Sequence, residues 1–88
     1  MCLRSRNVED MTTLIDEARA RRELPSPALA RAIREAAGVS QEGIARELEV
    51  TRMTICRWEA GTFKPSGQRL IAYAALLREL QHITGGTR

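Results

Sequence analysis

Hydrophobic residues recur at helical spacing along most of the chain and never alternate over a length typical of a strand. The first run, capped by Asn7, predicts an amphipathic helix over residues 8 to 23. Its apolar stripe comprises Val8, Met11, Leu14, Ile15 and Ala18. The segment Leu24-Pro25-Ser26-Pro27 ends this helix, because each proline lacks an N–H donor and disfavours helical backbone in the preceding residue.

Four further units follow, and each opens with a residue that caps helices well. Ser26 precedes a helix over residues 27 to 37, in which Leu29, Ile33 and Ala36 are expected to face inward and which Gly38 ends. Ser40 caps QEGIAREL, Thr51 caps RMTICRWEA, and Ser66 caps GQRLIAYAALLREL. The remaining QHITGGTR is expected to be a frayed tail. The pattern therefore predicts an all-α domain of five helices.

The third and fourth predicted helices are separated only by Glu49 and Val50, so they must meet at a sharp corner, as in a helix-turn-helix. Ala45 is small where the two helices come closest. Ile55 and Trp58 are three apart and share the inward face of the second helix. A different, outward face carries Arg52, Met53, Cys56 and Arg57. Arginine can bind guanine O6 and N7 in a bidentate contact worth ~1 to 3 kcal/mol of discrimination, and Met or Cys can pack on a thymine methyl.

Residues 28 to 80 resemble the lambda Cro/C1-type (Xre-like) helix-turn-helix repressors, through GVSQEGIAREL, EVTRMTICRWEAG and KPS in that order. The resemblance implies a compact five-helix, lambda-repressor-like bundle that binds operator DNA, usually as a two-fold dimer. The helix over residues 8 to 23 is then an N-terminal addition. We expect an N-terminal helix and linker over 1–25, a DNA-binding domain over 26–80 and a tail over 81–88.

The resemblance also implies roles for individual residues. Base edges in the major groove would be read by Arg52, Met53, Cys56 and Arg57. The DNA backbone would be contacted by Gln41, Thr51, Thr54 and Lys64. Structural roles would fall to Ala45, Ile55 and Trp58, and to a salt bridge between Arg34 and Glu59. Glu49 departs from the family, which usually places glycine at this turn because the residue commonly takes a left-handed conformation.

Composition and charge agree with this interpretation but are not specific to it. A single small domain of 88 residues leaves no room for a deep catalytic cavity, so an enzyme is disfavoured and no cofactor is implied. The net charge of +3 is unevenly distributed. Residues 7 to 24 carry five acids against three arginines, whereas residues 52 to 69 carry four basic residues against one acid. Positive potential is therefore expected around the second helix of the motif.

Several residues allow a second interpretation. Cys56 could be a redox switch or a metal ligand, although no second ligand is evident at metal-binding spacing. Trp58 could stack on a base, yet three aromatic residues do not make a stacking platform. Arg52 and Arg57 could form an ordinary solvated face. The stripe of the first helix either covers the bundle or packs against a second copy or another protein.

We predict a sequence-specific, double-stranded DNA-binding regulator, a repressor that acts as a homodimer in a bacterial cytoplasm at the nucleoid. The dimer surface would lie on the first helix or on the last one, which holds more apolar residues than one inward face requires. One alternative is an antitoxin that binds a toxin through residues 8–23. Another is a protein-interaction module without DNA binding. The two cysteines and the absence of an apolar run near ~18 residues predict a reducing, non-membrane location.

Overall fold

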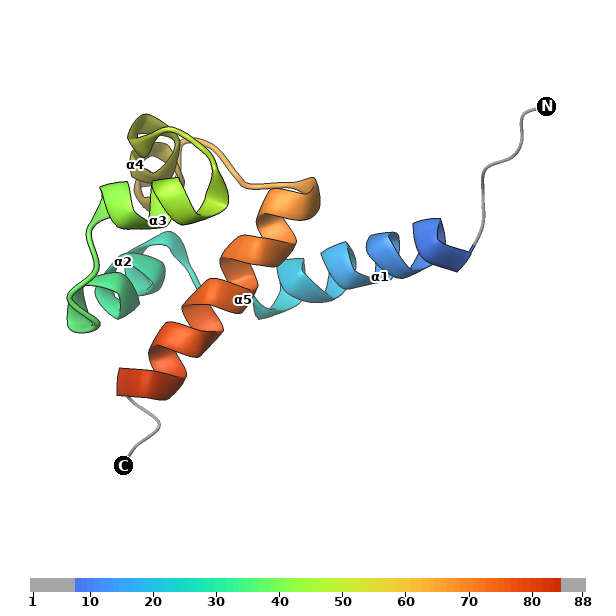
Figure 1. Ribbon diagram of the computed structural model, residues 1–88, viewed down its shortest axis with the longest axis horizontal. Coiled ribbons are helices and arrows are strands. Elements are labelled where there is room, and N and C mark those ends of the chain that lie inside the picture. Colours follow the sequence, from blue (N-terminus) through green and yellow to red (C-terminus); the bar gives the residue numbers. More distant parts are fainter. Residues whose placement is uncertain (1–7, 85–88) are drawn as a thin grey trace.

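The computed structural model describes the backbone of residues 8–84 and the side chains of residues 13–84. This part of the chain forms five helices, α1 (Val8–Glu23), α2 (Pro27–Ala36), α3 (Gln41–Leu48), α4 (Arg52–Ala60) and α5 (Gly67–Thr84). Helices α2 to α4 gather beside the long α5, and α1 packs on α5 and extends away from the other three (Figure 1). The predicted all-α bundle of five helices is confirmed.

Side-chain caps set the starts of three helices at the predicted residues. Ser26 Oγ accepts the backbone N–H of Leu29 at 3.2 Å, and Ser40 Oγ accepts that of Gly43 at 2.9 Å. Thr51 Oγ1 accepts the N–H of Thr54 at 3.1 Å. Each bond satisfies one of the backbone donors that a helix leaves free in its first turn. The proposed cap Asn7 lies outside the described residues.

The core lies where α2, α3, α4 and α5 meet. Its buried members are Ala30, Ile33, Ile44, Ala45, Ile55, Trp58, Tyr73 and Leu77. A smaller cluster of Ala20, Leu70 and Ala74 joins α1 to α5. Trp58 and Tyr73 pack with their ring centroids 4.7 Å apart, so α4 is attached to α5 through an aromatic pair.

The inward face of α2 differs from the predicted one. Leu29 is 48% exposed and Ala36 is exposed, whereas Ala30, Ile33 and Arg34 are buried. Both sets have helical spacing and share Ile33, so periodicity alone could not separate them. The buried face is the one that brings Arg34 to a carboxylate on α4, which a pattern of apolar residues does not reveal.

The stripe predicted for α1 does not cover the bundle. Leu14 is 68% and Ile15 50% exposed, and Ala18 is exposed. Helix α1 instead packs through Ala20, and Glu17 accepts the backbone N–H of Gly67 at 3.1 Å. The other two stripe residues, Val8 and Met11, precede the described side chains.

Helix α5 is longer than predicted. It continues through QHIT to Thr84, whose hydroxyl donates to the carbonyl oxygen of Leu80 at 3.0 Å. The expected tail therefore begins in the helix, and its last four residues lie beyond the described range. No helix in the described range 8–84 is long and apolar enough to cross a membrane.

Candidate nucleic-acid interface

The turn between α3 and α4 contains a residue in the left-handed backbone conformation. Glu49 caps α3 with φ 60° and ψ 43°, and the N–H of Val50 reaches the carbonyl oxygen of Ala45 at 2.9 Å. These features are those of a Schellman-type helix end, for which glycine is usual. Glu49 therefore takes the strained conformation that its position predicts, and the turn is not remodelled to avoid it. Ala45 is only 3% exposed, which agrees with its expected position between the two helices.

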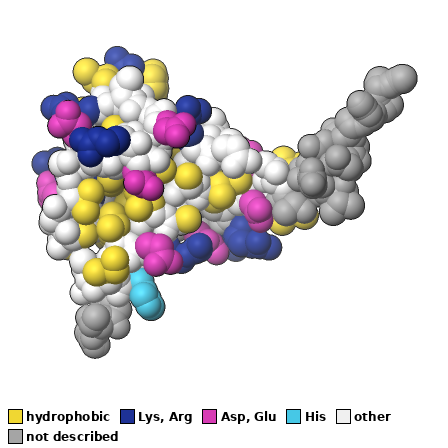
Figure 2. All heavy atoms as spheres, viewed as in Figure 1, with side chains coloured by type: hydrophobic (Ala, Val, Ile, Leu, Met, Phe, Trp, Pro, Cys, Tyr) yellow, Lys and Arg dark blue, Asp and Glu magenta, His cyan; other side chains and the backbone are white. Residues whose placement is uncertain are grey.

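Helix α4 separates its inward from its outward side chains as expected. Ile55 is fully buried and Trp58 lies in the same core cluster. Arg52, Met53 and Arg57 are exposed, and Cys56 is half-buried beside them. Basic and hydrophobic side chains consequently lie together on the surface over α4, at the top of the molecule (Figure 2).

A buried ion pair ties α2 to the end of α4. Arg34 donates through Nε and Nη2 to Glu59 Oε2 and Oε1, at 2.6 and 3.1 Å, and through Nη1 to the Val39 carbonyl oxygen at 2.9 Å. The hydrogen bond to Glu59 raises the pKa of Arg34, so the guanidinium stays charged. The salt bridge expected between these two residues is present, and its bidentate geometry fixes the orientation of α4.

Gln41 joins the same network. Its Nε2 donates to Glu59 Oε1 at 3.0 Å from the start of α3. Gln41, Arg52 and Cys56 also line one shallow hollow, which brings proposed DNA-contact residues of α3 and α4 together. A side chain held by Glu59 at the positive end of a helix is well positioned to meet a phosphate.

Thr51 and Thr54 form a connected pair at the start of α4. Their hydroxyl oxygens lie 2.9 Å apart, and either can donate to the other. Because two hydroxyls share this one bond, one hydroxyl proton remains to donate to a phosphate oxygen.

Sequence reasoning missed Phe63, which follows α4 in the loop leading to α5. The guanidinium of Arg57 lies over the Phe63 ring, 5.1 Å from its centroid. This cation–π contact limits the orientations of a proposed base-reading side chain. The sequence feature that could have indicated this contact is an aromatic residue two positions after Gly61, the residue that ends α4.

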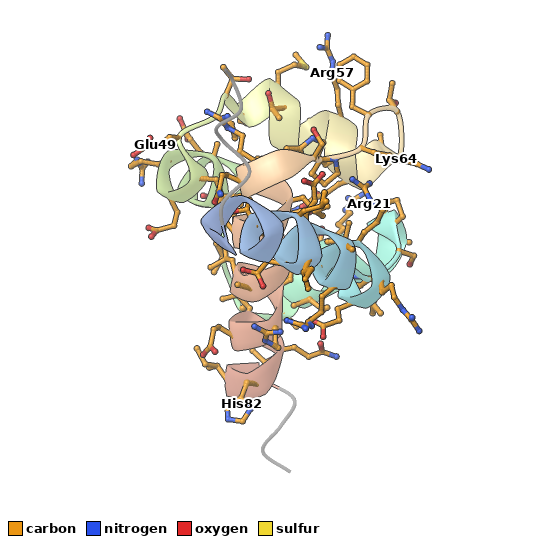
Figure 3. All side chains as sticks on the ribbon, turned by 90° about the vertical axis from the view of Figure 1, so that its right-hand side faces the viewer. Arg21, Glu49, Arg57, Lys64 and His82 are labelled. Carbon is orange, nitrogen blue, oxygen red and sulfur yellow. The ribbon has the colours of Figure 1, made fainter. Side chains whose placement is uncertain are left out.

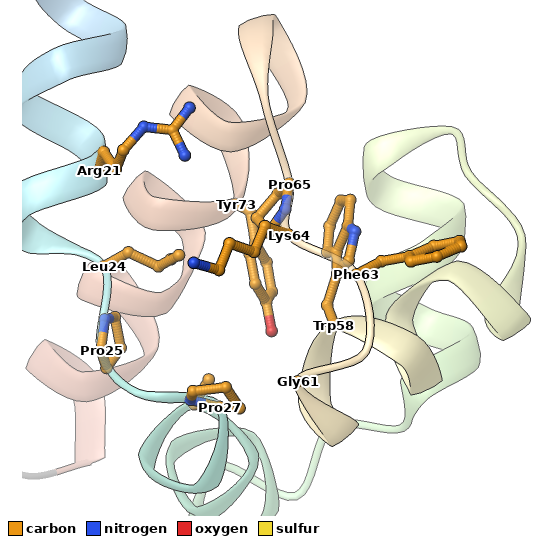
Figure 4. A pocket seen from close by; sticks show the side chains of 11 residues that line it. Arg21, Leu24, Pro25, Pro27, Trp58, Gly61, Phe63, Lys64, Pro65 and Tyr73 are labelled. Carbon is orange, nitrogen blue, oxygen red and sulfur yellow. The ribbon is translucent and has the colours of Figure 1, made fainter.

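Lys64 lies apart from the residues proposed to read bases. It is exposed on the same loop, and its side chain points toward Leu24 in the linker between α1 and α2 (Figure 4). Figure 3 shows Lys64 and Arg57 from the side, with Arg21 of α1 below them. A backbone contact by Lys64 stays a prediction.

Within residues 13–84, no group of three His, Cys, Asp or Glu side chains could hold a metal ion. Cys56 is a free cysteine.

A family model described as helix-turn-helix, of the Cro/C1 type, matches residues 31–81. This range contains α3, the turn at Glu49 and α4, and excludes α1. No curated protein and no solved structure is significantly similar to the chain.

Proposed function

Because the chain belongs to the Cro/C1-type helix-turn-helix family of DNA-binding transcription regulators, we propose that it is a repressor that binds its operator as a homodimer. The observation that carries the proposal is the exposure of Arg52, Met53 and Arg57 on a helix whose opposite face is buried. Each subunit inserts α4 into a major groove, and the two half-sites lie about one helical turn, ~34 Å, apart.

Within each half-site, base reading and backbone contact fall to different residues. Arg52 and Arg57 bind guanine edges, while Met53 and Cys56 pack on thymine methyl groups. Gln41, Thr51, Thr54 and Lys64 contact phosphates and set the register of α4 on the duplex. Occupancy of the operator then blocks polymerase.

The test is a selection of duplexes from a labelled random library with the purified chain. We expect enrichment of a two-fold symmetric site whose half-sites are about one helical turn apart. Enrichment of no sequence would contradict sequence-specific binding. Enrichment of a single unrepeated half-site would contradict the homodimer and leave the DNA-reading surface in place.

A second candidate function, an antitoxin that represses its own operon, is favoured by the exposure of Leu14 and Ile15 on α1. In that case these side chains contact a toxin rather than a second copy of the chain. Co-expression with the product of the neighbouring reading frame distinguishes the two. A stable complex that is lost on replacing Leu14 and Ile15 by serine supports the antitoxin, and a homodimer with nothing else bound supports the repressor.

A further inference from the structure

A pocket of about 220 Å³ lies on the side of the bundle, between the linker that follows α1 and the loop that follows α4 (Figure 4). Leu24, Pro25 and Pro27 line it from the linker side, and Trp58 and Tyr73 line it from the core. An apolar cavity of ~150 Å³ is enough to bind benzene, so this volume suits one aromatic ring with short substituents.

Two cations border the pocket. Arg21 projects from α1 and Lys64 from the loop, and both line the pocket (Figure 4). Arg21 Nη2 contacts Glu17 Oε2 at 3.3 Å, so one carboxylate already faces one of the two charges. Lys64 makes no ion pair with any residue in the described range. The border thus keeps an excess positive charge.

One polar group in the pocket wall is the hydroxyl of Tyr73. Tyr73 is only 2% exposed, and its hydroxyl makes no hydrogen bond within residues 13–84. The ring is directed so that this hydroxyl points into the space between Pro27 and Gly61 (Figure 4). Burial raises the pKa of Tyr73 to about 12, so the hydroxyl stays protonated and can donate near neutral pH. A buried donor without an acceptor is uncommon in folded proteins.

We propose that this pocket binds a small, single-ring aromatic carboxylate that carries a second polar group on the ring. The ring lies against Trp58 and the prolines, and the carboxylate faces Lys64 and Arg21. The second polar group accepts the hydrogen bond of the Tyr73 hydroxyl. Apolar walls with a few convergent polar groups are the usual composition of small-molecule sites. The site lies apart from the outward face of α4.

The experiment uses 4-hydroxybenzoate as the probe and NMR titration of the DNA-free chain as the measurement. The chain has one tryptophan, so the indole N–H signal of Trp58 is unambiguous. We expect a saturable shift of this signal. The neutral analogue 4-hydroxybenzamide should bind at least about ten-fold more weakly, because it lacks the charge that Arg21 and Lys64 bind.

Variants separate this site from general attraction to a basic protein. Arg21→Gln should weaken binding about five- to ten-fold, whereas Arg22→Gln, on the same helix but outside the pocket lining, should leave it unchanged. Tyr73→Phe should weaken binding of 4-hydroxybenzoate a few-fold and that of benzoate not at all.

Three results would overturn the proposal. The first is the lack of a saturable shift at Trp58 up to about 10 mM probe. The second is equal weakening by Arg21→Gln and Arg22→Gln, which would indicate non-specific attraction. The third is unchanged binding of 4-hydroxybenzoate by a folded Tyr73→Phe variant, because the hydroxyl would then make no contact. All three measurements are made without DNA. Their outcome therefore does not depend on whether the proposed repressor function is correct.

Discussion

Glu49 combines a side chain with a backbone conformation that favours glycine. Its φ of 60° lies in the left-handed region, which costs a non-glycine residue roughly 1 to 2 kcal/mol. Part of a glycine's advantage is lost to its greater freedom in the unfolded chain. We therefore expect Glu49→Gly to raise the unfolding free energy by about 0.5 to 1 kcal/mol, measured as a Tm increase of a few degrees by circular dichroism.

Glu49→Gln is the matched control for this change. It removes the charge at the negative end of α3 but keeps the Cβ that makes the conformation costly. We expect it to gain at most a few tenths of a kcal/mol. Equal stabilisation by the two variants would attribute the effect to charge and contradict the argument from backbone conformation.

Ionisation of Tyr73 should lower the stability of the folded chain at high pH. Its pKa is about 12 in the folded state against 10.0 ordinarily, because burial disfavours the phenolate. The folded state therefore holds the proton more tightly, and the resulting stabilisation is fully present below pH 10. It is lost as the pH rises through about 12. The loss should be on the order of 2 kcal/mol.

The measurement is urea unfolding of the chain and of Tyr73→Phe at several pH values between 9 and about 12. The variant should lose less stability than the unchanged chain over this window, because it has no phenol to ionise. Parallel curves for the two proteins would show that the hydroxyl does not titrate with a raised pKa.

At the scale of helices, capping residues made the starts of α2, α3 and α4 predictable. A cap is a local signal, because Ser26, Ser40 and Thr51 each bond to a backbone N–H three residues ahead. The pairing of Arg34 with Glu59 was not visible in any spacing rule, since the two lie 25 positions apart. It was expected only because the chain resembles a known family.

Which face of a helix turns inward was harder to predict than where the helix lies. The apolar stripe of α1 has good helical spacing, yet Leu14 and Ile15 are exposed and the contact with α5 runs through Ala20. A small residue lets two helices approach closely, so it can mark the packed face better than large apolar ones. Periodicity measures apolar content on a face and does not say which neighbour covers it.

Variants of the proposed base-reading and backbone-contacting residues should weaken DNA binding in different ways. Arg52→Ala or Arg57→Ala should cost about 1 to 3 kcal/mol on the selected duplex and relax the preference at one base position. Lys64→Ala should weaken all duplexes about equally and lower the slope of affinity against salt by about one. The measurement is fluorescence anisotropy with the selected duplex and its single-position variants.

Two controls accompany these measurements. Phe63→Leu removes the ring beneath Arg57 but no charge, so it should weaken binding less than Arg57→Ala does. Gln41→Ala requires a parallel unfolding measurement, because Gln41 also bonds Glu59. Equal losses on every duplex from the Arg52, Arg57 and Lys64 variants would contradict the division between base reading and backbone contact.

At the scale of the whole molecule, the packing of α1 changes where a second copy can bind. Its contact with α5 buries Leu70 and Ala74, two apolar residues of the other helix that was a candidate for the dimer surface. Tyr73 and Leu77 are buried in the main core. Among the described side chains of α1, those of residues 13–23, the large apolar ones that are exposed are Leu14 and Ile15. We therefore place the proposed two-fold interface on α1.

Replacing both Leu14 and Ile15 by serine tests this placement. Their burial against a second copy would contribute roughly 1.5 to 3 kcal/mol per fully covered side chain, and each change occurs twice in a symmetric dimer. The variant should therefore be a monomer at concentrations where the unchanged chain is a dimer, as measured by sedimentation equilibrium. Its Tm should stay close to that of the monomeric fold, because Leu14 is 68% and Ile15 50% exposed in the monomer.

Leu29→Ser provides the matched control, because Leu29 is a similarly exposed leucine on α2 and lies outside the proposed interface. It should remain dimeric. The double variant should still bind a single half-site through α4, but with the affinity of one subunit, since two linked contacts bind far more tightly than either alone. A double variant that stays dimeric, or a control that dissociates as well, would contradict the placement of the interface on α1.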